Sequence, residues 1–284
     1  MKMSNLLLLI ILAVCSYLVG NINWALIISK IKKTDIRQLG SGNPGTLNMS
    51  RNLGLKAGLL TFFLDIMKGA VPTLVAYFLT RDRHIAGTEF VVADFAIYLC
   101  GFCAVLGHIY PVFLKFKGGK GIASTIGVFL VCSCCYGWEW AVIMIMALVG
   151  AGVFIYFTEF GAMGSFIAIT PPAIGNAIRL FILYNETENI YAIVFYILSN
   201  LIILAICLFT WLAHRQNIQR MLAGEEHPTS IKDMVIKMKA KKARENNQEN
   251  VQEVDANSEN LNTNANEQSP LIDDNVNSQQ PTVK

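Results

Sequence analysis

The chain has 284 residues, of which 54% are hydrophobic and only 15% are charged, and its mean hydropathy is +0.45. This composition excludes an ordinary soluble globular domain. The net charge of +3 gives no reason to expect a nucleic-acid partner. Because a helix needs roughly 20 residues to cross a hydrocarbon core, the long apolar runs predict a polytopic membrane protein.

Seven apolar runs are candidates for membrane-spanning helices. They are continuous rather than alternating, which favours an all-α bundle over a β-barrel. Only Gly137 and its neighbours separate the fourth run from the fifth. The first run could also be a secretory signal, but its cleavage site is poor and the loop after it is basic, so we expect a retained anchor. The predicted spans are 5–28, 58–79, 90–113, 121–137, 138–157, 160–184 and 190–213.

The orientation follows from lysine and arginine, which are in excess in short cytoplasmic loops. The connections after the first and third spans are basic, whereas the connection after the sixth span carries Glu186 and Glu188 and no base. Seven spans then predict an N-terminus outside the cell, a cytoplasmic C-terminus and a place in the plasma membrane. The basic residues behind this prediction are Lys30, Lys32, Lys33, Arg37, Arg51, Lys56, Lys115, Lys117 and Lys120.

The seven cysteines all lie inside apolar runs, so no disulfide framework is predicted. Cys132, Cys134 and Cys135 could indicate a metal cluster, but no histidine or carboxylate stands near them at ligand spacing. We expect them to be small buried hydrophobic side chains. Neither a metal nor a diffusible cofactor is predicted, since a dinucleotide-binding loop is also missing.

The chain changes character near residue 229, after a predicted membrane domain of residues 1–228. Residues 229–244 carry apolar residues at helical spacing among basic ones, which is typical of an amphipathic helix on an anionic leaflet. The same pattern also fits a solvated basic stretch that only fixes topology. Residues 245–284 are rich in Asn, Gln, Glu and Asp and contain no aromatic residue, which predicts a disordered tail.

Three short polar strings interrupt the apolar chain, and all three fall on the predicted cytoplasmic side. Two are rich in glycine, whose backbone amides can converge on a phosphate because no side chain blocks the approach. The second opens onto the fourth span, where a helix N-terminus favours anions. It is not a Walker A loop, because Gly121 stands where Ser or Thr is required. The strings are Gly40-Ser41-Gly42-Asn43-Pro44-Gly45, Lys117-Gly118-Gly119-Lys120-Gly121 and His214-Arg215-Gln216-Asn217-Ile218-Gln219-Arg220.

Three further ionisable residues lie inside or near the predicted spans. His108, near the cytoplasmic end of the third span, could belong to a site or simply cap a helix. Asp65 and Lys68 are three residues apart in the second span, so they share a helix face and can neutralise one another. This pair could line the floor of a site or merely hold helices together.

Together, these strings resemble the three motifs of the PlsY family, the membrane acyl-phosphate:glycerol-3-phosphate acyltransferases. The resemblance covers residues 1 to about 228. The stretch from Asp65 through Lys68-Gly69-Ala70 to Pro72 is similar to another part of the family. The first motif is 40–45 with Asn48, Arg51 and Gly54; the second runs from Gly107-His108 through Pro111-Val112-Phe113 to 117–123; the third combines His214, Asn217, Ile218, Arg220, Gly224 and Glu225.

The resemblance implies an enzyme that moves a fatty acyl group from acyl phosphate to the 1-hydroxyl of glycerol 3-phosphate, giving lysophosphatidate and inorganic phosphate, with membrane lipids around it. Acyl phosphate is already activated, so positioning and charge stabilisation could suffice without a covalent nucleophile. Catalytic roles are implied for Ser41, Arg51, Lys120 and His214. Substrate-binding roles are implied for Gly42, Asn43, Asn48, His108, Lys117, Gly118, Gly119, Asn217, Arg220, Gly224 and Glu225.

Within this set, we expect Arg51 and Lys120, together with the amides of Gly118 and Gly119, to bind phosphate. His214 would bind phosphate or relay a proton. A substrate phosphate could itself accept the hydroxyl proton. The hydroxyl groups and the carbonyl oxygen of the substrates would be oriented by Ser41, Asn43, Asn48 and Asn217.

The chain departs from the family pattern in three places. Thr46-Leu47 stands where Ala-Thr is usual, Asn21-Ile22-Asn23 replaces Ser-Ile-Pro, and 158–165 lacks an expected Arg and Ser. These departures leave open an altered acceptor or a catalytically silent paralogue that acts as a scaffold. A transporter or flippase of a phosphorylated solute is a further alternative, but it predicts broken helices in both halves, whereas Pro171-Pro172 interrupts only the sixth span.

Overall fold

The computed structural model describes residues 4–85, 88, 90–226, 228–229, 232–233, 236 and 240. In this part of the chain the regular elements are helical, apart from one isolated bridge between His84 and Val91. Residues 4–229 belong to one compact unit. The disordered tail predicted for 245–284 lies outside the described residues, as does most of the basic segment predicted for 229–244.

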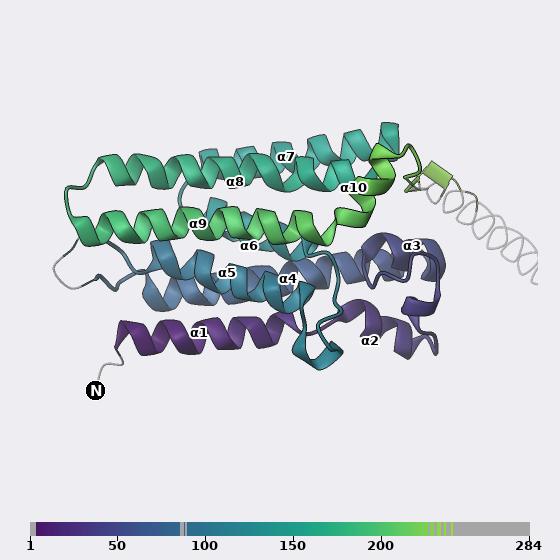
Figure 1. Ribbon diagram of the computed structural model, residues 1–284, viewed down its shortest axis with the longest axis horizontal. Coiled ribbons are helices and arrows are strands. Elements are labelled where there is room, and N and C mark those ends of the chain that lie inside the picture. The colour runs from purple at the N-terminus through teal and green to yellow at the C-terminus, as the bar shows by residue number, and fades with distance from the viewer. Residues whose placement is uncertain are drawn as a thin grey trace, which may run out of the picture. The chain divides into compact units, whose positions relative to one another are not determined.

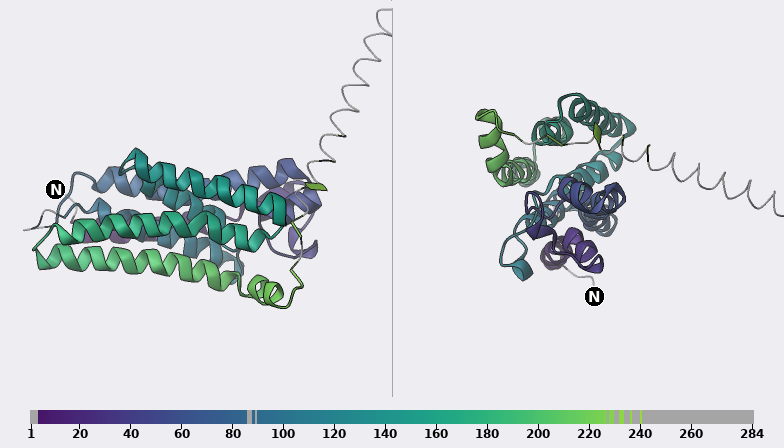
Figure 2. Two further views of the ribbon diagram at one scale, coloured as in Figure 1. Left: turned by 90° about the horizontal axis from the view of Figure 1, so that it is seen from above. Right: turned by 90° about the vertical axis from the view of Figure 1, so that its right-hand side faces the viewer.

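The helices form a bundle in three tiers (Figure 1). Helices α4, α5 and α6 make the middle tier, α1 packs against α4 and α5 on one side, and α8 and α9 pack against α6 and α5 on the other. Helices α3 and α10 lie at the same end of the bundle (Figure 2). The elements are α1 (Asn5–Gly20), α2 (Trp24–Ile31), η1 (Ile36–Gln38), α3 (Thr46–Leu53), α4 (Leu55–Thr80), α5 (Ala93–Ile109), η2 (Val112–Leu114), α6 (Ile122–Cys134), α7 (Trp138–Thr158), α8 (Gly161–Asn185), α9 (Ile190–Ala213) and α10 (Arg215–Leu222).

The predicted all-helical membrane architecture is confirmed, with a difference at the fourth span. Among the described residues, 6 helical segments are long and apolar enough to cross a membrane. Helix α6 has only 13 residues, or about 20 Å at 1.5 Å per residue, which is short of a full span. It ends early because the turn at Gly137, whose φ is 145°, separates it from α7.

The first predicted span, 5–28, is broken into α1 and α2. The side chain of Asn23 accepts a hydrogen bond from the amide of Leu26 at 3.0 Å and so caps the start of α2. In the break, the carbonyl of Ile22 accepts a hydrogen bond from Lys68 Nζ at 2.8 Å. Lys68 Nζ also lies 2.9 Å from Asp65 Oδ1, which confirms the predicted pair. Lys68 therefore ties α4 to the broken helix.

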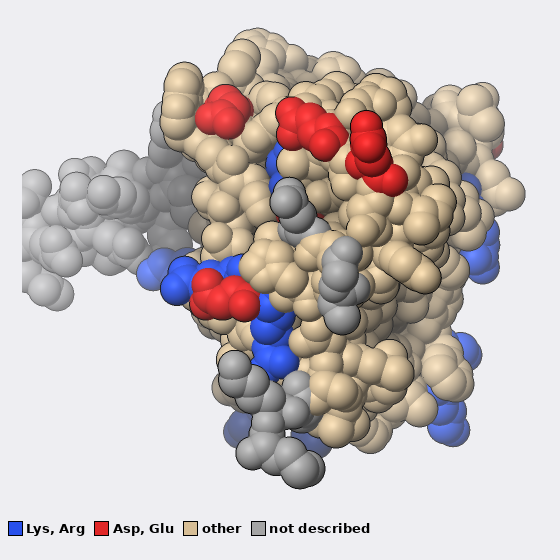
Figure 3. Space-filling view, turned by 90° about the vertical axis from the view of Figure 1, so that its left-hand side faces the viewer, with Lys and Arg blue, Asp and Glu red and all other residues tan. Residues whose placement is uncertain are grey.

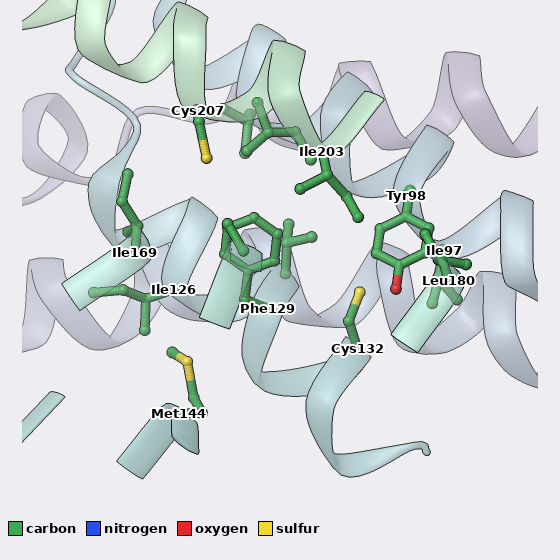
Figure 4. Packing of buried hydrophobic residues seen from close by; sticks show 14 of the residues in the cluster. Ile97, Tyr98, Ile126, Phe129, Cys132, Met144, Ile169, Leu180, Ile203 and Cys207 are labelled. Carbon is green, nitrogen blue, oxygen red and sulfur yellow. The ribbon is translucent and has the colours of Figure 1, made fainter. Parts of the chain in front are cut away.

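The apolar core lies between the middle tier and α7, α8 and α9 (Figure 4). Phe129 and Met144 are fully buried there. Helices α4 and α6 approach each other closely at Gly69. A Cβ atom at this position would stand 2.1 Å from the carbonyl oxygen of Ser124, so a larger residue would not fit here. The expectation of buried cysteines holds for Cys132 and is wrong for Cys134, which is exposed.

A buried ion pair that the sequence analysis did not single out links two helices. Arg179 Nη2 of α8 lies 3.0 Å from Asp94 Oδ1 of α5. The guanidinium of Arg179 also stacks over the ring of Tyr136, 3.4 Å from its centroid. Asp94 lies in the first turn of α5, so this contact fixes α5 and α8 at the end where α5 begins.

Candidate active site

A cavity of about 500 Å³ lies where α3 and α10 meet the middle tier. Its size is within the usual range for small-molecule sites. Residues from all three polar strings line it, although the strings are far apart in the sequence. The sequence-predicted residues that line the cavity are Ser41, Asn43, Asn48, Arg51, His108, Lys120, His214, Asn217 and Arg220. Those that do not line it are Gly42, Lys117, Gly118, Gly119, Gly224 and Glu225.

Asn48 holds the first polar string in place. Its Oδ1 accepts hydrogen bonds from the amide of Ser41 at 3.2 Å and from Asn52 Nδ2 at 3.0 Å. Its Nδ2 donates to the carbonyls of Ile36 at 3.3 Å and Leu39 at 3.0 Å. An amide side chain has two donor hydrogens and two lone pairs, so all of its hydrogen-bonding capacity is used. Asn48 therefore fixes the loop around Ser41, and its predicted substrate-orienting role stays a prediction.

In the second polar string, the two amides that were expected to bind phosphate have backbone partners. The amide of Gly118 donates to the carbonyl of Ile109, and that of Gly119 to the carbonyl of His108, both at 3.1 Å. These two amides are therefore committed to backbone acceptors. Glycine is needed here for close approach instead, since a Cβ atom on Gly119 would stand 2.2 Å from His108 Nε2. Lys117 is exposed and does not line the cavity.

His108 lies beside Asp65 in the cavity wall. His108 is 5% exposed, and its Nδ1 is 3.9 Å from Asp65 Oδ1, which is too long for a hydrogen bond. Asp65 lines the cavity, whereas Lys68 does not. Asp65 thus faces the cavity, whereas Lys68 contacts the break between α1 and α2.

Lys120 begins a chain of polar contacts across the cavity. Its Nζ donates a hydrogen bond to Asn217 Oδ1. Asn217 Nδ2 in turn donates to Glu226 Oε1 at 2.8 Å, and Arg220 Nε lies 3.3 Å from Glu226 Oε2. Burial lowers the pKa of Lys120 to about 8; Arg220 and Arg51 also lower it, while Glu226 opposes them. Lys120 is therefore a cation whose charge changes close to neutral pH.

Glu226 is a cavity residue that the sequence analysis missed. Its side chain is only 6% exposed, whereas its neighbours Gly224 and Glu225 are exposed and lie off the cavity. Glu226, rather than Glu225, is thus the glutamate at the cavity, and the binding role predicted for Glu225 stays a prediction. The sequence alone does not tell which of two adjacent glutamates faces the cavity. The choice becomes visible only in the structure, where Asn217 and Arg220 contact Glu226.

His214, at the end of α9, is 3% exposed. Its Nδ1 is 2.9 Å from the carbonyl oxygen of Thr210. A carbonyl only accepts, so Nδ1 carries the hydrogen and Nε2 is left as an acceptor. Burial lowers the pKa of His214 to about 4, with the hydrogen bond to the Thr210 carbonyl opposing this effect and the charge of Lys120 adding to it. A neutral ring does not attract phosphate by charge, and its Nε2 can accept a hydrogen bond from a ligand.

Arg51 reaches from α3 toward the C-terminal part of the described chain. Its Nη2 donates to the carbonyl of Pro228 at 2.9 Å and its Nε to the carbonyl of Thr229 at 3.3 Å. Burial lowers the pKa of Arg51, and the carboxylates of Glu226 and Glu159 oppose that effect. The guanidinium thus sits near two acids but bonds to uncharged carbonyl oxygens.

The opposite wall of the cavity is apolar. Small residues on two neighbouring helices leave its volume open, notably Ala151 and Gly152 of α7 and Ala168 of α8. Ile126 of α6 and Ile155 of α7 add branched aliphatic surface. One end of the cavity therefore suits anions and the other suits a hydrocarbon chain. Within the described part of the chain, no group of three or more His, Cys, Asp or Glu side chains is placed to hold a metal ion.

Comparison with known proteins assigns the family. Residues 10–224 match the family model described as glycerol-3-phosphate acyltransferase. The chain belongs to the glycerol-3-phosphate acyltransferase family. The acyltransferase of Mycoplasmopsis pulmonis is 37% identical over 231 residues, which cover 77% of this chain and 92% of that protein. The enzyme of Aquifex aeolicus is 34% identical over 216 residues, covering 76% and 96%.

Solved structures of this acyltransferase family share the fold. Crystal structures of PlsY (YgiH), an integral membrane glycerol 3-phosphate acyltransferase, match in a glycerol 3-phosphate form and a lysophosphatidic acid form. The TM-scores are 0.58 and 0.56, at 31% and 30% identity. Each match covers 78% of this chain and 94% of the PlsY chain. This chain is thus a multi-pass membrane member of the family, and its C-terminal residues from 225 on lie beyond the family match.

Proposed function

We propose that this acyltransferase moves a fatty acyl group from acyl phosphate to the 1-hydroxyl of glycerol 3-phosphate, releasing lysophosphatidate and inorganic phosphate. The observation that carries this proposal is a single cavity with a cationic end and an apolar end. Arg51, Lys120 and Arg220 line the cationic end, as two phosphate-bearing substrates require. Small residues of α7 and α8 leave room for the acyl chain.

The reaction needs no covalent enzyme intermediate. The 1-hydroxyl oxygen attacks the acyl carbonyl carbon, the bond from that carbon to the phosphate oxygen breaks, and the hydroxyl proton passes to the leaving phosphate or to His214 Nε2. Negative charge grows on the carbonyl oxygen and the leaving phosphate, close to Lys120 and Arg51. Fixed cations stabilise such charge without reorganising. Holding both substrates in one cavity lowers the barrier further, because the reacting groups are already positioned beside each other.

We also propose that the cavity faces the cytoplasm, with the N-terminus outside and the protein in the plasma membrane. The basic connections before α3 and α6 lie beside the cavity-lining residues Ser41 and Lys120. The end of the bundle away from α3 and α10 instead presents acidic and basic side chains together (Figure 3). The excess of positive charge at the cavity end supports a cytoplasmic location for it.

A donor comparison tests the proposed reaction. Purified protein in lipid nanodiscs would receive labelled glycerol 3-phosphate with either acyl phosphate or acyl-CoA. Labelled lysophosphatidate should form with acyl phosphate and not with acyl-CoA alone. Product with acyl-CoA would contradict the proposed donor. Uptake of labelled glycerol 3-phosphate into vesicles without acylation would identify a transporter, and neither product nor uptake would identify a silent scaffold.

A further inference from the structure

Pro228 and Thr229 follow α10 and lie at the edge of the cavity, which Thr229 lines, and we call this dipeptide the strap. Thr229 is 1% exposed and lines the cavity. Its amide donates a hydrogen bond to the carbonyl of Glu159 at 3.0 Å, which pins the strap to the turn between α7 and α8. The Thr229 Oγ1 is buried and makes no hydrogen bond within the described residues. The backbone of the strap, rather than its hydroxyl, therefore makes its polar contacts.

The strap holds a cation of the site. The Pro228 and Thr229 carbonyls accept hydrogen bonds from Nη2 and Nε of Arg51 at 2.9 and 3.3 Å. A guanidinium has five N–H donors, so three remain for a ligand. Carbonyl oxygens carry no net charge and leave the positive charge of Arg51 available to an anion. Fixing the long side chain in advance also reduces the entropy lost when a ligand binds.

We propose that the strap orients Arg51 toward a phosphate-bearing substrate, which makes Thr229 a positioning residue of this site. The strap lies beyond residues 10–224, the part of the chain that matches the family model. The inference rests on the proposed function, because it assigns the phosphate of glycerol 3-phosphate to Arg51.

The test loosens the strap in the full-length protein. Thr229→Pro removes the amide hydrogen that bonds to Glu159 and leaves both carbonyls in the chain. The expected result is a KM for glycerol 3-phosphate about tenfold higher, with a smaller change in kcat, because substrate binding loses a preorganised hydrogen-bonding group. Thr229→Val keeps the amide and the side-chain shape, and it should recover most of the affinity that Thr229→Pro loses.

A double-mutant cycle separates positioning of Arg51 from a general effect on structure. In an Arg51→Ala background, Thr229→Pro should raise the KM no further, since the group that it misplaces is already gone. An equal rise in both backgrounds would overturn the proposal. An unchanged KM in Thr229→Pro would also overturn it. A lower KM would overturn it as well, because it would show that the strap competes with the substrate for Arg51. If Thr229→Pro does not fold, as judged by thermal unfolding, inserting two glycines between Pro228 and Thr229 loosens the strap by another route, with the same outcomes expected.

Calorimetric binding of glycerol 3-phosphate distinguishes failure of the strap from failure of the proposed function. Binding that Thr229→Pro weakens, in a protein that makes no product, would contradict the proposed reaction and support the strap. Acyl transfer at wild-type KM in Thr229→Pro would contradict the strap alone. A wild-type protein that binds no glycerol 3-phosphate would contradict both.

Discussion

Lys120 is the cavity cation whose charge should respond to pH under ordinary assay conditions. Burial lowers its pKa to about 8, so the ammonium is charged below that pH and is lost above it. The KM for glycerol 3-phosphate should therefore rise as the pH increases through about 8. Kinetic measurements between about pH 7 and pH 9.5 check this, because the substrate phosphate, with a second pKa near 6, changes little in that range.

The matched variant for this pH dependence is Lys120→Arg. A guanidinium stays charged at every pH used. Its KM should be independent of pH across the same range, even if its turnover is lower. A rise at the same pH in this variant would show that another group is responsible.

Glu226 and Glu225 offer a paired test of which acid faces the site. In Glu226→Gln the group facing Arg220 becomes uncharged, and the negative charge that raises the pKa of Lys120 disappears. We expect kcat/KM at pH 8 to fall about tenfold. Glu225→Gln changes an exposed side chain and should cost much less. Steady-state kinetics of the two proteins decide between them, and a larger loss in Glu225→Gln would reverse the assignment.

Residue type and spacing predicted which side chains gather, and tertiary contacts decide what they do. Lys120, Arg51 and His214 lie at the cavity as expected. Ionisable groups near apolar spans face the interior of a bundle or a water-filled cavity, because contact with lipid is energetically costly. The commitment of Asn48 and of the Gly118 amide to backbone partners could not be predicted. Their partners are in other segments, and an Asn or a glycine amide binds substrate or backbone equally well on chemical grounds.

At the scale of elements, the loop before α6 depends on glycine at its contact with α5. A Cβ atom on Gly119 would stand 2.2 Å from His108 Nε2, so Gly119→Ala must displace a buried imidazole. We expect a loss of about 1–3 kcal/mol in stability together with reduced acyl transfer. A Cβ atom on Gly150 would meet nothing within 4 Å. Gly150→Ala is therefore the control, and thermal unfolding in one detergent compares the two; equal effects would refute the contact.

The lengths and positions of the elements were predictable only in part. Continuous apolar runs located α4, α5, α7, α8 and α9, because lipid requires each span to satisfy its own backbone. The break after α1 was not predicted, since it depends on Lys68, 46 residues away, bonding to the carbonyl of Ile22. The short α6 was also missed: its apolar residues reflect burial among other helices rather than contact with lipid.

For the whole molecule, the proposed orientation makes a direct prediction. Single cysteines introduced into a cysteine-free background at Lys33 or Lys115 should be modified only from the cytoplasmic side, because both lie in connections at the cavity end. Cysteines at Asp82 or Glu186 should be modified only from outside. Labelling with a membrane-impermeant maleimide on intact cells and on inverted vesicles measures this. Labelling of the cysteines introduced at Lys33 and at Asp82 from the same side of the membrane would contradict the topology.

The central claim is that one cavity, with Lys120 at its cationic end, transfers the acyl group. Its most direct test is formation of labelled lysophosphatidate from acyl phosphate and glycerol 3-phosphate by Lys120→Ala and Lys117→Ala proteins at equal amounts in the membrane. The account predicts a fall in kcat/KM of about 10²–10³ for Lys120→Ala. Most of the activity should remain in Lys117→Ala, because Lys117 is exposed and does not line the cavity. Product formation at the wild-type rate by Lys120→Ala would contradict it.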